Sequence, residues 1–227
     1  MRCLAVVFVS LLIGCTTQPS PPPFVSGESI LIRGIITTET ATEFKRELTQ
    51  SKITRVLLDS GGGDVESAIE IANLIRKHEL DVDVIGKCYS SCANYLFPAG
   101  RTKTISELGI VAWHGNAHHL LYLHKTGRKP VTASNLAVLT RLTALESAFF
   151  DSIGVDQFIC WFGKIEPFNV RNLYFLSKRD MERFGIREVM VRADYGASNL
   201  SGTNIRDNLN LRLLSVDWSS YSVKVPE

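Results

Sequence analysis

Short apolar runs alternate with amphipathic segments along most of the chain. Apolar, β-branched stretches predict strands at 29–35, 55–58, 82–85, 104–105 and 110–113. Segments with helical periodicity predict helices at 38–50, 64–77, 93–97 and 132–153. Asp64 is suited to cap the start of the second helix, and Gly154 to end the last one. Strands that alternate with helices through short connections predict an α/β domain with a mostly parallel sheet.

The first fifteen residues predict an export signal rather than folded structure. Arg2 supplies a positive charge, and the apolar stretch 4–13 is too short to span a bilayer. The run Leu12-Ile13-Gly14-Cys15 resembles a bacterial lipobox, which implies that residues 1–14 are removed and that Cys15 is lipidated. The alternative is an ordinary buried apolar segment with a chance cysteine.

The segment that follows the lipobox predicts a tether. Residues 15–28 are rich in proline near their middle, and such a sequence forms an extended, semi-rigid spacer. Thr16, directly after the cysteine, resembles the second residue of lipoproteins that are sent to an outer membrane. We therefore expect a lipoprotein of the bacterial cell envelope that faces the periplasm, anchored in the outer membrane through its N-terminal lipid.

The rest of the chain predicts one domain over 29–192 and a polar tail over 193–227. The formal net charge of the whole chain is +2, and loss of residues 1–14 removes one charge, that of Arg2, to leave +1. A near-neutral chain lacks the basic surface that binds nucleic acid. We therefore expect no nucleic-acid partner.

Three motifs that carry chemistry each follow a predicted strand. They are the glycine run 61–63, the two serines of Cys88-Tyr89-Ser90-Ser91-Cys92, and His114. In parallel α/β sheets the functional loops gather where strands end. A serine hydrolase requires backbone N–H groups that bind the oxyanion, an activated serine and a histidine that takes its proton. The order of the motifs therefore favours a peptidase-like enzyme.

Each motif also has a structural interpretation. The glycine run 61–63 suits a tight turn that holds a phosphate, but Asp64-Val65-Glu66 follow it where a phosphate loop needs a lysine and a hydroxyl. Ser91 is suited to cap a helix, and His114 to end a strand without any catalytic role. A structural role for each residue does not account for their occurrence in this order.

The cysteines of the exported chain are disulfide candidates, because an oxidising compartment permits disulfides. A bond between Cys88 and Cys92 would close a small loop around the two serines and hold it rigid. A structural zinc site is the alternative, but the chain lacks a second pair of ligands at a recognisable spacing. Cys160 stands in an apolar run and is expected to be buried.

A cluster of histidines invites a metal-site interpretation. Its members are His114, His118, His119 and His124. Gly115-Asn116 disfavours a helix that would bring His114 and His118 onto one face, and no residues that would orient the histidine ligands are evident. We therefore expect no metal and no organic cofactor, and we expect residues 118–124 to form an exposed loop or helix over the site.

The order and spacing of the motifs resembles the superfamily of the Clp protease proteolytic subunit and the crotonases, over roughly 30–191. Residues 57–63 are similar to the family's strand and Asn-Ser-Pro-Gly-Gly turn. Residues 91–100 resemble its serine, apolar helix and Ala-Gly ending, and 111–114 its strand ending in the catalytic histidine. The segments 174–177 and 184–186 resemble its Phe-Met/Leu-Ser and Tyr-Gly-Leu sequences. Exported Clp-like proteins with a Cys-x-Ser-x-Cys turn are the most similar group.

The resemblance implies a mostly parallel sheet with repeated β-β-α units, a peptide or protein substrate, and homo-oligomers. It implies that Ser91 is the nucleophile and that His114 acts as base and then as acid. The N–H groups of Gly62 and Cys92 would bind the oxyanion. Ser90 is the alternative nucleophile, because counting forward from Gly86 aligns Ser90, whereas counting back from Gly100 aligns Ser91. One residue is therefore inserted between the two glycines.

The acid of the triad has no direct counterpart, because Arg171-Asn172-Leu173 replaces the family's aspartate. Asn172 is the candidate to orient the imidazole, as an asparagine does in cysteine proteases. Otherwise the enzyme works as a dyad, or the acid comes from elsewhere. The competing hypothesis is a catalytically inactive lipoprotein that keeps the fold as a binding scaffold. An acyl-coenzyme A enzyme is disfavoured, because that cofactor is cytoplasmic and this chain is expected to be exported.

Overall fold

The computed structural model describes residues 21–193, 195, 211–214 and 216–218. The expected signal segment 1–14, Cys15 and most of the expected tail lie outside these residues. Within them, no helix has both the length and the apolar character needed to cross a membrane.

A seven-stranded sheet forms the centre of the domain, in the order β1-β2-β3-β4-β5-β8 with β6 also paired to β4. β1 runs antiparallel to β2, and all other pairs in the sheet are parallel. The strands are β1 Phe24–Ser26, β2 Ser29–Ile36, β3 Arg55–Gly63, β4 Asp81–Tyr89, β5 Lys103–Ile105, β6 Ile110–Ala112 and β8 Val189–Val191. A second, two-stranded parallel sheet consists of β7 Tyr174–Leu176 and β9 Arg212–Leu214.

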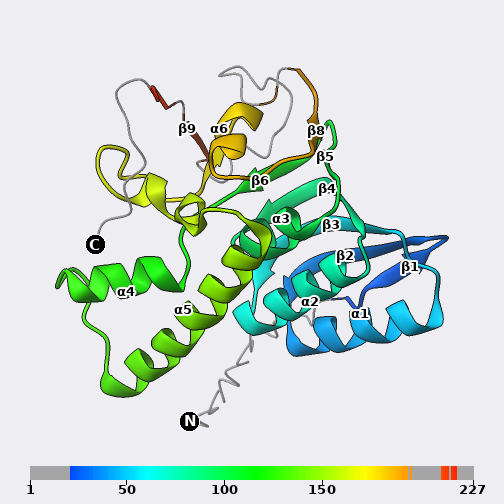
Figure 1. The fold of residues 1–227 in the computed structure, drawn as a ribbon, viewed down its shortest axis with the longest axis horizontal. Helices are drawn as coiled ribbons and strands as arrows, with labels where there is room; N and C mark the ends of the chain where they lie inside the picture. The colour runs from blue at the N-terminus through cyan, green and yellow to red at the C-terminus, as the bar shows by residue number, and fades with distance from the viewer. Residues whose placement is uncertain (1–20, 194, 196–210, 215, 219–227) are drawn as a thin grey trace, which may run out of the picture.

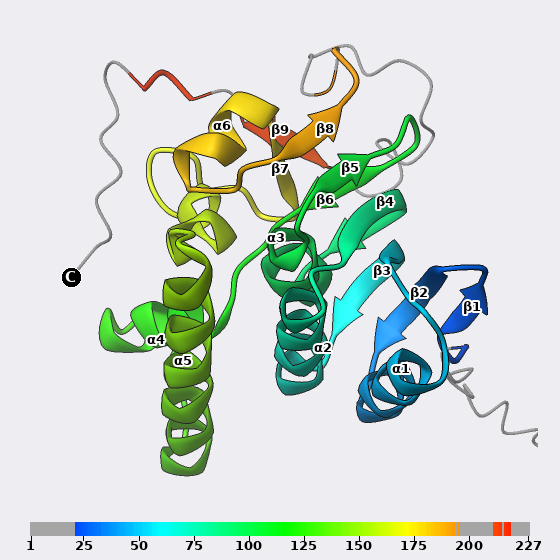
Figure 2. The same cartoon turned by 45° about the vertical axis from the view of Figure 1, so that its right-hand side comes forward.

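Helices connect the strands and cover the sheet. The α-helices are α1 Thr38–Gln50, α2 Val65–Lys77, α3 Phe97–Ala99, α4 Ala117–Lys125, α5 Ala133–Ile153 and α6 Lys178–Arg183. A π-helix, η1 Cys92–Leu96, precedes α3, and two short 3₁₀-helices are η2 Gln157–Cys160 and η3 Phe162–Lys164. Figures 1 and 2 show α1, α2 and α3 on one face of the sheet. In both views the first half of α5 extends beyond the sheet, with α4 beside it.

The prediction of an α/β fold with a mostly parallel sheet is confirmed. Helices α1, α2 and α5 match the predicted spans closely, Asp64 caps α2 through the Ser67 N–H, and Gly154 ends α5 in the left-handed conformation. Several boundaries differ, and β4, for example, runs to Tyr89 instead of ending at 85. β3 continues through the glycines that were expected to form a turn, because Gly62 and Gly63 pair with Ile35 and Ile36 of β2. The apolar run expected as an α-helix at 93–97 is mostly the π-helix η1.

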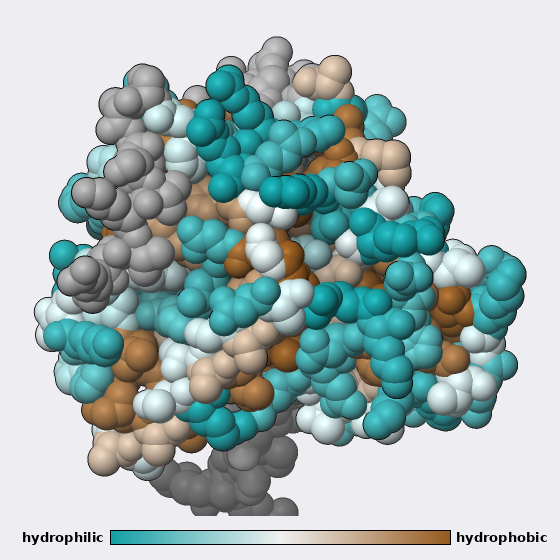
Figure 3. Space-filling view, in the orientation of Figure 1, coloured by the Kyte–Doolittle hydropathy of each residue, from teal (hydrophilic) through white to brown (hydrophobic). Residues whose placement is uncertain are grey.

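The core lies between the central strands and the helices. Val56 and Leu58 of β3, and Val82 and Val84 of β4, are fully buried and alternate with partly exposed residues, so one face of these strands is buried more deeply than the other. A second group of buried rings joins the C-terminal segments to the sheet; it contains Phe158, Phe162, Tyr174 and Phe184. Figure 3 shows a largely polar surface on the viewed face, with apolar residues scattered among polar ones.

Candidate active site

The three motifs meet at one edge of the sheet. Ser60 pairs with Cys88 across β3 and β4, and Tyr89 pairs with Ala112 across β4 and β6. Because these strands are parallel, their carboxyl ends lie together. The end of β3, the serine turn after β4 and His114 after β6 are therefore brought to one place, as the sequence predicted.

A disulfide joins the two ends of the serine turn. The Sγ atoms of Cys88 and Cys92 are bonded, and their Cα atoms lie 5.2 Å apart. Cys160 is buried and has no disulfide partner among the described residues. The predicted pairing is thus present, and it links the end of β4 to the first residue of η1.

Ser90 occupies the strained position of this turn. Its φ is +54°, in the left-handed region that non-glycine residues rarely adopt. Its N–H donates to the carbonyl of Ala112, and its own carbonyl accepts from the N–H of Asn94. The residue is half-buried, and its hydroxyl makes no hydrogen bond within the described part of the chain. Ser90 is thus held by its backbone, while its side chain remains unbonded.

Ser91 is placed differently. Only 3% of the residue is exposed, and its Oγ donates to the carbonyl of Gly63 at 2.8 Å. Its backbone is in the ordinary right-handed helical region. No hydrogen bond joins Ser91 or Ser90 to His114 among the residues that the structure describes. Ser91 therefore ties the start of the helix to the end of β3.

A cavity of about 240 Å³ opens beside the turn. Ser90, Ser91 and His114 all contribute to its wall. Its apolar wall comes mainly from α2, α4 and α5 and contains Val65, Ala117, Leu120, Leu139 and Leu142. The three residues predicted to carry the chemistry therefore share one cavity, and its apolar lining suits an uncharged side chain of a substrate.

The electrostatic environment keeps both histidines of this cavity neutral. His114 reaches the surface, but desolvation by the protein around its ring lowers its pKa, and the charge of Lys164 lowers it further. Burial lowers the pKa of His119 to about 4, with Lys164, His114 and Lys129 as smaller causes. The His119 ring stacks on Trp161 with centroids 5.7 Å apart. At neutral pH His114 is therefore available as a base.

The Gly62 N–H, expected to bind an oxyanion, has a partner in this structure. It donates to the Ser60 Oγ at 3.1 Å, and the Ser60 hydroxyl donates to the Gly34 carbonyl at 2.7 Å. Cys92, the other predicted donor, is the first residue of η1, so its N–H has no carbonyl within its own helix to bond. The helix start therefore offers the more available donor.

Asn172 is exposed and does not orient His114 within the described structure. Its carbonyl accepts from the Lys164 Nζ at 3.0 Å, and its side chain makes no hydrogen bond with the histidine. Lys164 also donates to the Arg171 carbonyl at 2.7 Å. The segment that was expected to orient the His114 ring therefore binds Lys164 instead, and the charge of Lys164 acts on that ring.

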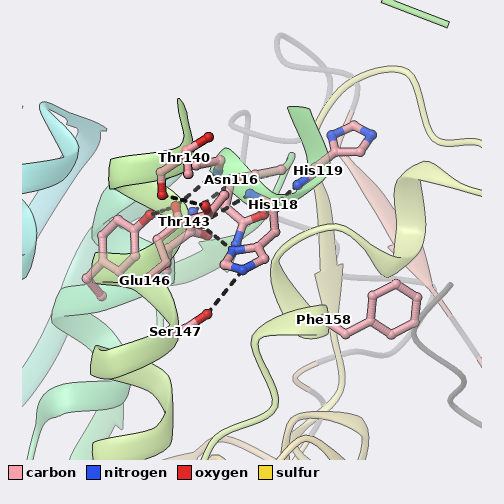
Figure 4. A network of polar contacts seen from close by, with 12 residues as sticks. Asn116, His118, His119, Thr140, Thr143, Glu146, Ser147 and Phe158 are labelled. Carbon is pink, nitrogen blue, oxygen red and sulfur yellow. Dashed lines mark hydrogen bonds and ion pairs between the residues drawn. The ribbon is translucent and has the colours of Figure 1, made fainter. Parts of the chain in front are cut away.

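Sequence reasoning missed a buried acid, Glu146 of α5, whose side chain is fully buried. Figure 4 shows it at the centre of a polar network with His118 and Ser147. The sequence carries a signal for it. The buried positions of α5 recur at three- and four-residue spacing, and Glu146 occupies one of them, where an apolar residue is expected.

The histidine cluster is not a metal site in the described residues, where no group of three or more His, Cys, Asp or Glu side chains is arranged to hold a metal ion. Asn116 caps α4 by accepting from the His119 N–H, so His114 lies before this helix and His118 within it. His118 points toward Glu146 and Ser147, whereas His119 points away from them (Figure 4). The prediction that residues 118–124 form a helix or loop beside the site agrees with α4.

No profile of a known protein family matches the chain, and no curated protein matches it. Among solved structures, it is similar to a mutant ClpP1 from Listeria monocytogenes, with 18% sequence identity and a TM-score of 0.44. The alignment covers 74% of this chain and 93% of that one. The classification of the fold therefore rests on the sheet order and on the alternation of strands and helices.

Proposed function

We propose that this protein is a serine hydrolase, a peptidase of the Clp type, in which Ser90 attacks the acyl carbon of a peptide substrate. One observation carries the proposal. Ser90 stands at positive φ between a strand and a helix, with an unbonded hydroxyl at the wall of a cavity that it shares with His114. A strained serine at a strand-to-helix turn is the arrangement that presents a nucleophile in many hydrolases.

The surroundings of the two serines favour Ser90 over Ser91. The Ser91 proton is engaged by the Gly63 carbonyl, and the residue is almost fully buried. An attack by Ser91 would first require this hydrogen bond to break. Ser90 has no such bond and is more exposed.

The π-helix supports the same choice. The two alignments of the serine turn differ by one inserted residue, and a π-helix holds one more residue per hydrogen-bonded turn than an α-helix does. In η1 the Phe97 N–H donates to the Cys92 carbonyl, five residues back. The extra residue is thus accommodated after the turn. The alignment that counts forward from Gly86 then needs no insertion before the serine, and it favours Ser90 as the nucleophile.

In the proposed reaction the Ser90 Oγ bonds to the acyl carbon while its proton moves to His114. The protonated imidazole then gives that proton to the leaving amine, and water hydrolyses the acyl-enzyme by the same steps in reverse roles. The N–H groups of Ser91 and Cys92, at the start of the helix, are the proposed oxyanion donors. Gly62 joins them only if its N–H leaves the Ser60 Oγ.

Among the described residues no acid bonds to the His114 imidazole, and this limits the expected rate. Lys164 lowers the pKa of His114, which favours the base but disfavours the imidazolium that forms in the reaction. We therefore propose a dyad rather than a triad. Its activity without a bound partner is expected to be low.

We also propose that the protein is exported, anchored in the outer membrane by lipid on Cys15, and forms homo-oligomers. The Cys88–Cys92 disulfide supports an oxidising compartment. The lipobox-like run ending at Cys15 and the proline-rich segment after it support an anchor with a tether. Mass spectrometry of the N-terminal peptide from bacterial membranes tests the lipid, and an unmodified, uncleaved Met1 would contradict it.

A second candidate function is a catalytically inactive binding lipoprotein. The observation in its favour is that, within the described part of the chain, neither serine donates to His114 and the Asn172 side chain makes no hydrogen bond with it. Apo geometry does not rule out a dyad, because catalytic hydrogen bonds often tighten only with substrate. The two candidates predict opposite results in one experiment.

Labelling of the purified domain with a fluorophosphonate probe is that experiment. We expect the wild type to be labelled at Ser90, labelling to be lost in Ser90→Ala and His114→Ala, and Ser91→Ala to retain it. Ser91→Ala is the matched control, since it removes the neighbouring hydroxyl of the same turn. Loss of labelling in Ser91→Ala but not in Ser90→Ala would assign the nucleophile to Ser91. A folded wild type that is not labelled would favour the binding lipoprotein.

A further inference from the structure

Glu146 is a fully buried carboxylate with an unusual set of partners. Its Oε1 accepts from the Tyr95 hydroxyl at 2.5 Å and from the Ala117 N–H at 3.0 Å. Its Oε2 accepts from the His118 N–H at 3.3 Å and lies 2.8 Å from the His118 Nδ1. Both oxygens are thus bonded twice, and no lysine or arginine pairs with Glu146 in the described chain.

These partners belong to the two segments that carry the proposed chemistry. Tyr95 lies in η1, which begins two residues after Ser90, and Ala117 and His118 open α4, which begins three residues after His114. Tyr95 and Ala117 also contribute to the wall of the cavity. One carboxylate on α5 therefore holds the segment of the nucleophile and the segment of the base at the same time.

His118 completes the connection. Its Nδ1 faces Glu146, and its Nε2 lies 3.2 Å from the Ser147 Oγ, so both ring nitrogens contact neighbouring residues of α5 (Figure 4). The imidazole is thereby fixed against this helix. With the two backbone bonds to Glu146, it sets the start of α4 three residues after His114.

Packing alone does not explain a carboxylate here. Burial of a carboxyl group is costly unless its oxygens are hydrogen-bonded, and apolar side chains of similar volume often replace buried polar groups without loss of stability. Four directed hydrogen bonds, by contrast, fix the relative positions of three elements in a way that a leucine cannot. The hydrogen bonds therefore indicate that Glu146 fixes the relative positions of these elements rather than stabilising the fold.

We infer that Glu146 is a positioning residue of the proposed active site, which sets the separation of Ser90 and His114 without touching the substrate. This inference rests on the proposed function of the two residues. Glu146 does not replace the triad acid, because it bonds to Tyr95 and to the start of α4 rather than to the His114 ring within the described residues. Misplacement of reacting groups by about 1 Å can slow a reaction roughly 100-fold.

The test compares Glu146→Gln with Phe44→Leu. Glutamine keeps the shape and one acceptor oxygen but loses the second, whereas Phe44 is buried in α1, outside the site and the network. Both variants are labelled with the fluorophosphonate probe at a temperature at which circular dichroism shows each to be folded. We expect Glu146→Gln to be labelled about 10- to 100-fold more slowly and Phe44→Leu at the wild-type rate. With a p-nitrophenyl ester, kcat should fall while KM stays nearly constant.

A wild-type labelling rate in folded Glu146→Gln would overturn the inference. Phosphonylation mapped to Ser147 would also overturn it, because the Ser147, His118 and Glu146 trio would then be a nucleophilic centre of its own. If the wild type is not labelled at all, the proposed function fails, and NMR decides the inference separately. Faster amide exchange at Ala117 and His118 in Glu146→Gln, with shifted resonances of Ser90 and His114, would support positioning; unchanged resonances would refute it.

Discussion

Gly62 lies so close to the serine turn that a Cβ on it would be 2.7 Å from the Cβ of Ser90. The same Cβ would lie 2.6 Å from the Tyr89 carbonyl oxygen and 2.8 Å from the Ser91 nitrogen. Real Cβ atoms do not approach other atoms this closely. The end of β3 therefore packs directly against the serine turn. Glycine is required at this position because a side chain would clash with the turn and because its φ is +88°.

Gly62→Ala is expected to destabilise the protein by at least about 2–4 kcal/mol, because backbone strain adds to a clash with the turn backbone. Gly127→Ala is the matched control, since Gly127 has a φ of +70° but open space where its Cβ would be. It should cost only about 1 kcal/mol. Urea unfolding of both variants measures the difference, and equal losses would mean that the turn moves freely away from β3.

Ser90→Gly should leave the protein as stable as the wild type or about 1 kcal/mol more stable. Glycine relieves the cost of the left-handed conformation, about 1–2 kcal/mol, while its greater freedom in the unfolded chain takes back about 0.5–1 kcal/mol. Labelling by the fluorophosphonate probe should be lost in the same variant. Thermal melts beside the labelling assay give both values, and a clear loss of stability would contradict the strain assigned to Ser90.

The buried His119 should make the protein less stable in acid. Its pKa is about 4 in the folded chain and about 6.5 when unfolded, so between these values the unfolded chain binds more protons. The resulting stability is fully present above about pH 6.5, decreases as the pH falls, and levels off below about 4. The loss of stability between neutral pH and pH 4.5 amounts to about 2–3 kcal/mol.

His119→Phe keeps a ring against Trp161 but removes this titration. Denaturant unfolding at pH 7.5 and pH 4.5 should therefore show a smaller pH dependence for His119→Phe than for the wild type. The difference between the two proteins isolates the histidine from the carboxylates that also titrate in this range. Parallel losses of stability in both proteins would mean that His119 is protonated in the folded state.

Desolvation is the main cause of the lowered pKa of His114, and the charge of Lys164 should add to it. Because its charge lowers the pKa of His114, Lys164→Gln is expected to raise that pKa toward the ordinary histidine value. A histidine NMR titration measures the shift directly, and the acidic limb of the labelling rate should move to higher pH with it. Lys45→Gln, an exposed substitution on α1, serves as the control. An unchanged His114 titration in Lys164→Gln would mean that the charge of Lys164 does not affect the pKa of His114.

The disulfide should stabilise the serine turn more than the whole fold. A loop as short as that between Cys88 and Cys92 contributes about 2 kcal/mol by chain entropy, so the Cys88→Ser, Cys92→Ser double variant should lose about this much. Labelling of Ser90 is expected to slow more than the loss of stability explains. Amide exchange at residues 89–93 checks the local effect, and exchange equal to wild type would exclude it.

The sequence predicted the sheet and the place of the site because both depend on local patterns. Apolar runs identified the strands, and the end of each parallel strand fixed where the glycines, the serine turn and His114 meet. The same reasoning predicted the Cys88–Cys92 pair. These features are local, since each is specified by residues close together in the chain.

The contacts made across the fold could not be predicted in this way. The Gly62 N–H bonds to the Ser60 Oγ and the Ser91 Oγ to the Gly63 carbonyl, and both bonds depend on the exact path of β3. Glu146 is more than 50 residues from Ser90, and only packing of α5 against η1 and α4 brings it near. A polar residue in an apolar helical stripe was the visible signal, but its partners were not.

α5 is long, and its two halves have different surroundings. One half of this helix packs against the domain, and the other half extends beyond the sheet (Figure 1). Arg141 ties it to Glu66 of α2, and Glu146, one turn further along, holds η1 and α4. The loop after α4 leads into the overhanging half, and α4 packs against α5. A partner that binds the exposed side chains of this half would therefore contact the same helix that holds Glu146 in place.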